Sequence, residues 1–172
     1  ILRKKIDSND INSLKIITYK SAYKGAVADS ELWAPKTRET ADHSMLVAVI
    51  ITLLDGSITP ETFERERFLD KDVLKLINRT KVEVSEKFSM LTPSIRNCRL
   101  EAISKSGETY EAELSLSAKD IETGLSEVEI KTKFMSLCSK VMHRQSSERL
   151  YSHLQDIENL NDVSTIVCRT RI

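Results

Sequence analysis

Residues 40–54 read TADHSMLVAVIITLL, and the fold prediction starts from this stretch. It contains no Gly or Pro, and after Ser44 it is apolar on nearly every side. Asp55 and Gly56 follow, and a glycine at this place is a common helix stop. The apolar run is about half of the ~20 residues needed to cross a bilayer. The pattern therefore predicts a central helix over residues 40–54 that is buried all round.

Short β-strands are predicted on both sides of that helix. Residues 12–19 alternate in hydrophobicity and are rich in β-branched side chains, as is typical of a half-buried strand. Alternation recurs at residues 81–84, 99–104 and 109–116. Ser106-Gly107 separates the last two segments, which predicts a β-hairpin with its turn around residues 105–107.

Helix-start signals punctuate the remaining sequence. Thr59 precedes Pro60 and Glu61, which combines a capping hydroxyl, a first-turn proline and an acidic residue. Asp70 offers a similar cap for a helix over residues 73–77.

Two amphipathic helices are predicted near the carboxy terminus. Ser126 and Glu129 form a capping-box signature, and apolar residues recur at helical spacing from there to a helix end near His143. Residues 147–157 carry a second apolar stripe. Helices and strands are thus mixed without regular βαβ alternation, which indicates an α+β fold with a buried central helix, a sheet that includes a hairpin, and carboxy-terminal amphipathic helices.

Bulk properties narrow the classes of function. The 172 residues suit one core with a small appended element. Lys and Arg number 26, and Asp and Glu also number 26, which removes the electrostatic argument for a nucleic-acid or anionic-membrane partner but leaves a local basic site open.

Three widely spaced cysteines, at positions 98, 138 and 168, predict buried free thiols in a reducing compartment. The charged start at residues 1–6 lacks a methionine, so we expect a segment cut from a longer protein.

Polar and charged side chains converge in residues 33–44, just before the apolar run. A helix amino terminus presents unpaired N–H groups and a positive dipole end. Together with Lys36, Arg38 and His43 it would make a cradle for a carboxylate, and the implied ligand is a small anion.

The alternative is that Asp42 or Thr40 only caps the helix while Arg38 and Glu39 are solvated. Elsewhere, His143 and His153 lack the spacing of a metal site and are expected on the surface. Aromatic and basic residues at 19–24 are interpreted as edge packing. Without a Gly-rich phosphate loop or a zinc signature, neither a nucleotide nor a metal cofactor is predicted.

The same polar block carries a family resemblance. It resembles the signature block of the MmgE/PrpD family, and the likeness continues in register and spans nearly the whole chain. The stretches that carry it are Glu31-Leu32-Trp33, Thr37 through Ser44, Leu53-Leu54-Asp55-Gly56, residues 58–63, Asp72-Val73-Leu74 and Leu125-Ser126 with Glu129 and Lys133-Phe134.

The resemblance implies a two-domain subunit with its active site in the cleft between a large helical domain and a smaller α+β lid. This chain resembles the lid over residues 1–142, and residues 143–172 are expected to pack on the absent amino-terminal helical domain. Members act on citrate-like acids: 2-methylcitrate dehydratase eliminates water, and cis-aconitate decarboxylase removes a carboxylate, both without an iron-sulfur cluster. The implied protein is a cofactor-free hydro-lyase, a homodimer, and cytoplasmic or, in a eukaryote, in the mitochondrial matrix. The fragment alone is expected to be inactive.

The resemblance also assigns roles to individual residues. His43 and Ser44 match the family's His-Ser pair, and His43 is the expected catalytic residue, a proton donor or relay. Lys36, Arg38, Asp42 and Ser44 are the expected substrate-binding residues, with Arg38 gripping a carboxylate. The competing interpretation is that the block only fixes the loop and the helix entry.

One departure from the family pattern bears on activity. Many members have Pro and Tyr shortly after the His-Ser pair, where this chain reads Met45-Leu46-Val47, and Gly124 replaces the proline of a later Pro-Leu-Ser. Loss of the phenol removes a hydrogen-bond donor from the implied active-site wall. The second hypothesis is therefore a non-catalytic binding or dimerisation module that keeps the fold but has lost the activity.

Overall fold

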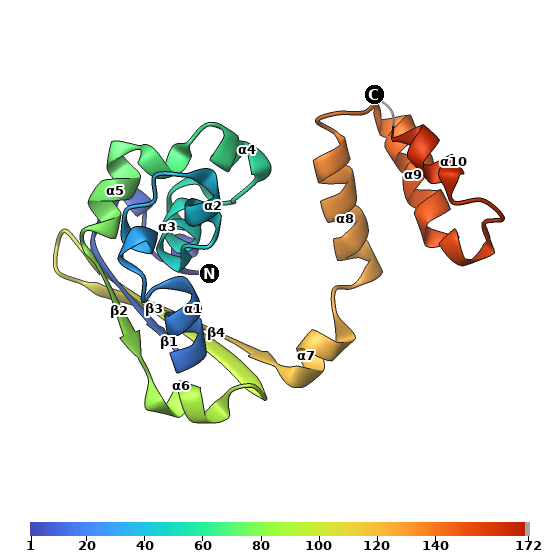
Figure 1. Cartoon of the computed structure of the whole chain (residues 1–172). Helices are drawn as coiled ribbons and strands as arrows, with labels where there is room; N and C mark the ends of the chain where they lie inside the picture. The colour runs from blue at the N-terminus through green and yellow to red at the C-terminus, as the bar shows by residue number, and fades with distance from the viewer. Residues whose placement is uncertain (171–172) are drawn as a thin grey trace. The chain divides into compact units, whose positions relative to one another are not determined.

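The computed structural model describes residues 1–170, except for the side chain of Arg169. Its chain forms two compact units, Ile1–Ile121 and Glu122–Ile172 (Figure 1). The expected boundary between residues 142 and 143 falls in the turn between two helices of the second unit. No described helix is long and apolar enough to cross a membrane.

A mixed β-sheet organises the first unit. Among the described residues it has four strands in the order β2-β1-β3-β4, namely β1 Ile11–Thr18, β2 Thr80–Val84, β3 Ile95–Ser104 and β4 Thr109–Ser117. β1 pairs in parallel with β2, and β3 pairs antiparallel with both β1 and β4. The predicted strands and the β3–β4 hairpin are confirmed, and so is the α+β class.

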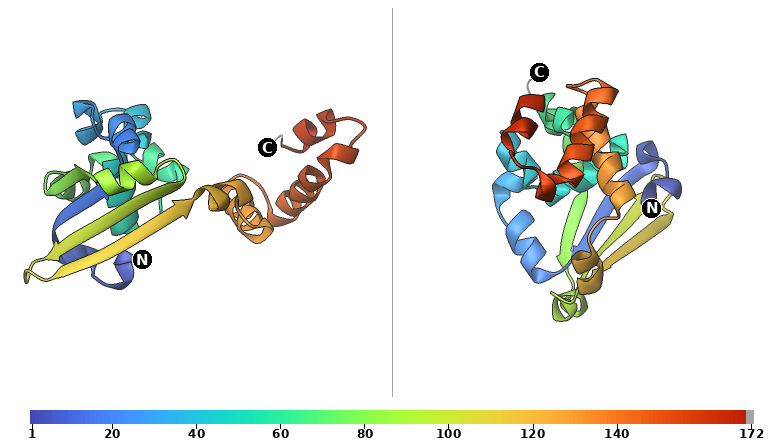
Figure 2. Two further views of the ribbon diagram at one scale, coloured as in Figure 1. Left: turned by 90° about the horizontal axis from the view of Figure 1, so that it is seen from below. Right: turned by 90° about the vertical axis from the view of Figure 1, so that its right-hand side faces the viewer.

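Most helices of the first unit gather on one side of this sheet (Figure 2, left). The helices of the first unit are η1 Leu2–Lys4, η2 Ser8–Asp10, α1 Lys20–Ala26, η3 Ser30–Trp33, α2 Arg38–Asp42, α3 Met45–Asp55, α4 Pro60–Glu64, η4 Arg67–Leu69, α5 Lys71–Ile77 and α6 Glu86–Leu91, and α7 Ala118–Thr123 spans the boundary between the units. α1 forms where edge packing was expected, and α6 was not predicted. Both are too short for a hydrophobic period to identify them.

The predicted central helix exists, but it is shorter and less buried than the prediction for residues 40–54. The chain breaks after α2, and α3 starts at Met45 rather than Thr40. α3 buries Leu46, Val47, Ile50, Ile51 and Leu53, whereas Thr52 is exposed, so one broad face rather than the whole circumference is covered. Its end at Gly56, where φ is 93°, agrees with the predicted stop because glycine adopts this left-handed conformation without strain.

The core lies between this helix face and one face of the sheet. Leu14 and Ile16 of β1 and Ala102 of β3 join α3, η4 and α5 in one buried cluster that includes Phe68. Alternate residues of the same strands form a charged opposite face, because successive side chains of a strand point to opposite sides. There, register partners are ion-paired: Lys15 Nζ lies 2.9 Å from Glu101 and Arg99 Nε lies 2.7 Å from Glu113.

The second unit is a small helical assembly made of α8 Glu127–Cys138, α9 Arg144–Gln155, η5 Ile157–Asn159 and α10 Ser164–Arg169. The capping box of Ser126 and Glu129 is confirmed, and α8 ends at Cys138 rather than near His143. The rings of Phe134 and Tyr151 pack 5.3 Å apart between centroids and join α8 to α9. Packing of residues 143–172 on an amino-terminal helical domain stays a prediction.

The three cysteines are free, as predicted, but they are not uniformly buried. Cys98 and Cys138 are half-buried, whereas Cys168 is exposed. Burial raises the pKa of the Cys98 thiol above its usual value, which disfavours its reactive thiolate form.

Candidate functional site

The polar block occupies two helix entries rather than one. Its amino-terminal side is anchored by Trp33, whose indole Nε1 donates a hydrogen bond of 2.8 Å to the carbonyl of Val27. Leu32 and Pro35 are buried on either side. The anchored chain then enters α2, whose cap is Thr37: its Oγ1 accepts a hydrogen bond of 3.2 Å from the backbone N–H of Thr40.

Ser44 caps the central helix α3. Its Oγ accepts from the backbone N–H of Val47 at 3.3 Å and donates to the carbonyl of Leu32 at 2.6 Å. The interpretation that Asp42 or Thr40 caps this helix is therefore wrong, because a second helix intervenes and Ser44 takes an extended conformation between the two. Since Ser44 is 1% exposed and its hydroxyl proton is committed to Leu32, the geometry favours a role in fixing the helix entry. Direct contact of Ser44 with a substrate stays a prediction.

The remaining predicted residues lie on the outside of the same turn. The His43 side chain is 74% exposed, and its Nε2 lies 3.6 Å from the Asp42 carboxylate. Lys36 and Arg38 are exposed, and in the described part of the chain neither forms an ion pair. Arg38 and Asp42 share a face of α2, whereas Arg38 and His43 lie about 140° apart on a helical wheel. The structure thus joins Asp42 to His43 and separates Ser44, which is buried, from the other four.

Val47 lies at the position where the resemblance expects an active-site tyrosine. It is completely buried and belongs to the core cluster of the first unit. A valine here fills the interior and offers no hydrogen-bonding group.

Substitutions at His43 and Ser44 should differ in their effect on the free energy of unfolding. Ser44→Ala removes a cap and leaves the Leu32 carbonyl without its donor, so we expect the free energy of unfolding to fall by about 2 kcal/mol. His43→Ala changes an exposed side chain and should alter it by less than about 0.5 kcal/mol. Chemical denaturation of both variants checks this, and equal losses would contradict the structural division.

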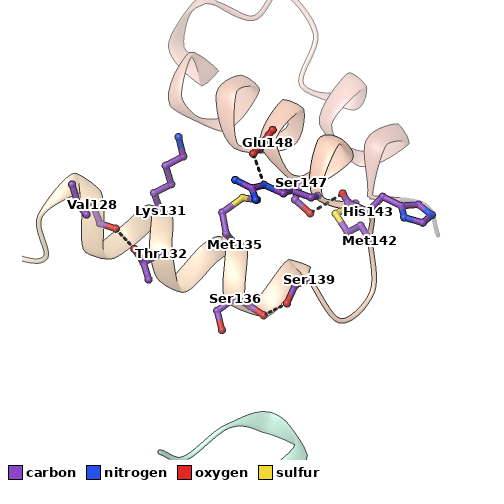
Figure 3. Close-up of a pocket in the computed structure, with 11 residues that line it drawn as sticks. Val128, Lys131, Thr132, Met135, Ser136, Ser139, Met142, His143, Ser147 and Glu148 are labelled. Atoms are coloured by element: carbon purple, nitrogen blue, oxygen red, sulfur yellow. Dashed lines mark hydrogen bonds and ion pairs between the residues drawn. The ribbon is translucent and has the colours of Figure 1, made fainter.

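A hollow lies in the second unit, between α8 and α9 (Figure 3). Its volume is about 820 Å³. Lys131 and Met135 point from α8 toward α9, where Arg144 and Glu148 form an ion pair of 2.9 Å. The lining includes His143, which was expected on the surface and is exposed. It also includes Val128, Met135 and Met142, which recur every seven residues in the sequence but were not predicted to form a site.

This hollow is lined both by apolar side chains, such as Met135, and by charged ones, such as Lys131 and Glu148. Across residues 1–170, no group of three or more His, Cys, Asp or Glu side chains is placed to hold a metal ion. None of the site residues predicted from the sequence, Lys36, Arg38, Asp42, His43 and Ser44, lines this hollow.

Comparison with known proteins identifies the class of this fold. Residues 2–170 match the family model described as the MmgE/PrpD C-terminal domain, so the chain belongs to the MmgE/PrpD family. It is similar to cis-aconitate decarboxylase of Mus musculus, with 25% identity over 132 residues. That alignment covers 77% of this chain but only 27% of the mouse protein's length.

Proposed function

We propose that this chain is the carboxy-terminal domain of a lyase that acts on a small di- or tricarboxylate. Dehydration of a citrate-like acid, as in 2-methylcitrate dehydratase, is the reaction we assign first. The observation that carries the proposal is the family match over residues 2–170. The exposed cations Lys36 and Arg38, in the same polar block as His43, support an anionic substrate, although Arg38 and His43 point in different directions.

This domain supplies only some of the acid–base and binding groups that the reaction needs. Eliminating water from a β-hydroxy acid removes a proton α to a carboxylate, releases the hydroxyl group with an added proton, and forms a carbon-carbon double bond. An imidazole gives or takes a proton near neutral pH, so His43 suits the protonation of the leaving hydroxyl. Arg38 and Lys36 suit the substrate carboxylates. We assign the base to a helical domain that precedes this one and completes the site, and we propose that the full-length protein is a homodimer.

A second candidate is a non-catalytic binding or dimerisation module. Two observations favour it: Ser44 is committed to capping α3, and Val47 is fully buried where an active-site tyrosine was expected. Capping and core packing account for both residues without a catalytic role.

The full-length protein should decide between them. We expect it to dehydrate citrate or 2-methylcitrate, with absorbance of the new double bond as the measurement, and we expect His43→Ala to lower kcat about 100-fold. Decarboxylation of cis-aconitate, measured as released CO2, tests the related reaction. His153→Ala, a histidine on α9 outside the block, is the matched control and should keep full activity.

The outcomes separate the alternatives. A wild-type protein that turns over none of the three acids would support the non-catalytic module and overturn the lyase assignment. A fully active His43→Ala variant would instead keep the lyase and remove His43 from its mechanism.

A further inference from the structure

A second cluster of cationic side chains lies in the first unit, away from the α2–α3 turn. It is a hollow of about 270 Å³, and its polar lining consists of Ser8, Asn9, Asp72, Lys75, Arg79 and Lys105. Leu54 and Leu76 contribute apolar surface. The volume lies just below the ~300–1,000 Å³ of pockets that enclose whole organic ligands, so it suits a small ion or one acidic group.

Two segments that are distant in sequence supply the cations. Lys75 belongs to α5, and Arg79 follows the end of that helix, with its carbonyl accepting a hydrogen bond of 3.2 Å from the N–H of Leu14. Lys105 comes from the β3–β4 turn, which reaches toward α5 (Figure 1). Its backbone N–H donates to the carbonyl of Asp10 at 2.9 Å. Backbone hydrogen bonds therefore hold both ends of the cluster in place.

The charges of this hollow are not balanced by its own carboxylates. In the described structure, Lys75, Arg79 and Lys105 form no ion pair. The one lining carboxylate, Asp72, already receives two hydrogen bonds from Arg67, at 2.7 and 2.8 Å. Those bonds hold the pKa of Asp72 below its usual value. The dipole at the carboxy-terminal end of α5 accounts for Lys75 and Arg79 in part, but it gives no reason for Lys105, which a hairpin supplies.

We propose that this hollow binds a small oxyanion with two negative charges, either a phosphate group or a dicarboxylate. Arg79 offers a planar fork of donors, the two lysines add point charges, and Ser8 and Asn9 add neutral polar groups. Because the three cations are exposed, the affinity is modest, with a Kd on the order of 1 mM. The site is independent of the proposed lyase chemistry.

Titration of the 172-residue chain tests the proposal, with backbone amide NMR shifts as the readout. Inorganic phosphate is one ligand and malonate the other, both at constant ionic strength. We expect saturable shifts at Ser8, Asn9, Lys75, Arg79 and Lys105. Each of the single variants Lys75→Gln, Arg79→Gln and Lys105→Gln should raise Kd about fivefold. The triple variant should lose saturable binding.

A control of equal charge change keeps the interpretation clear. Lys24→Gln, Lys87→Gln and Lys119→Gln together remove three exposed lysines outside the hollow, and this protein should bind as the wild type does. Lys105→Gln leaves α5 unchanged and serves as the decisive single variant if the triple variant fails to fold. The ratio of the phosphate and malonate affinities assigns the class of oxyanion. Shifts that are linear in both ligands, that map elsewhere, or that persist unchanged in Lys105→Gln would overturn the proposal.

Discussion

Replacing Phe68 by Ala is expected to lower the free energy of unfolding of the first unit by about 3–5 kcal/mol. Phe68 is completely unexposed and lies in η4, which packs against α3, α4 and α5. Removing its ring withdraws apolar surface from the core and leaves a cavity that these helices fill only partly. Since small domains are stable by about 5–15 kcal/mol, this is a large fraction of the total.

Guanidinium denaturation followed by tryptophan fluorescence measures the effect. Trp33 is the chain's one tryptophan and lies in the first unit, so its signal reports on that unit. Leu69→Ala is the matched control, because Leu69 follows Phe68 in the same 3-10 helix but is 40% exposed. It should cost about 1 kcal/mol or less. Similar losses in both variants would show that the core does not centre on Phe68.

Replacing Arg67 by Met is expected to lower the free energy of unfolding by about 2–3 kcal/mol at pH 7. The Arg67 guanidinium donates to both oxygens of Asp55, at 2.9 Å each, and to both oxygens of Asp72. It also donates to Asp70 at 3.0 Å. One side chain thus ties the end of α3 to the start of α5, and its loss leaves three carboxylates facing one another. Their side chains are 37–58% exposed, so water limits the cost to less than that of a fully buried pair.

The loss should depend on pH in a defined direction. Hydrogen bonds from Arg67 lower the pKa of Asp72, so Asp72 contributes stability above its unfolded value of 3.8 and loses that contribution as the pH falls below it. The pKa of Arg67 is raised by the same partners, and the guanidinium stays charged throughout. The difference between the wild type and Arg67→Met should therefore shrink as the pH drops below about 4.

Denaturation curves at pH 7 and at pH 3 check both statements. Arg65→Met removes an exposed arginine two positions away and should cost less than about 0.5 kcal/mol at either pH. A loss in Arg67→Met that is the same at both pH values would mean that packing of the side chain, rather than its charge, holds the helices together.

The sequence was sufficient for features whose causes are local. The stop at Gly56, the start at Thr59-Pro60 and the capping box of Ser126 and Glu129 each depend on groups within four residues of one another. The hairpin turn and the strand alternation are equally local, because a period of two reports which side of a sheet is covered. The α+β class follows from the order of such segments, and the polar block from side chains that are neighbours in the chain.

Packing between distant segments determined the features that the sequence did not predict. The break between α2 and α3 requires the carbonyl of Leu32, which accepts from Ser44 across twelve positions, and no local pattern contains that bond. The parallel pairing of β1 with β2 joins Leu14 to Thr80. Burial of Val47 and the placement of Lys75 and Lys105 around one hollow depend on how helices lie on the sheet. Residue types and spacing determine which groups are present and which short elements form, whereas free energy of burial, summed over contacts far apart in sequence, determines which groups remain accessible for chemistry.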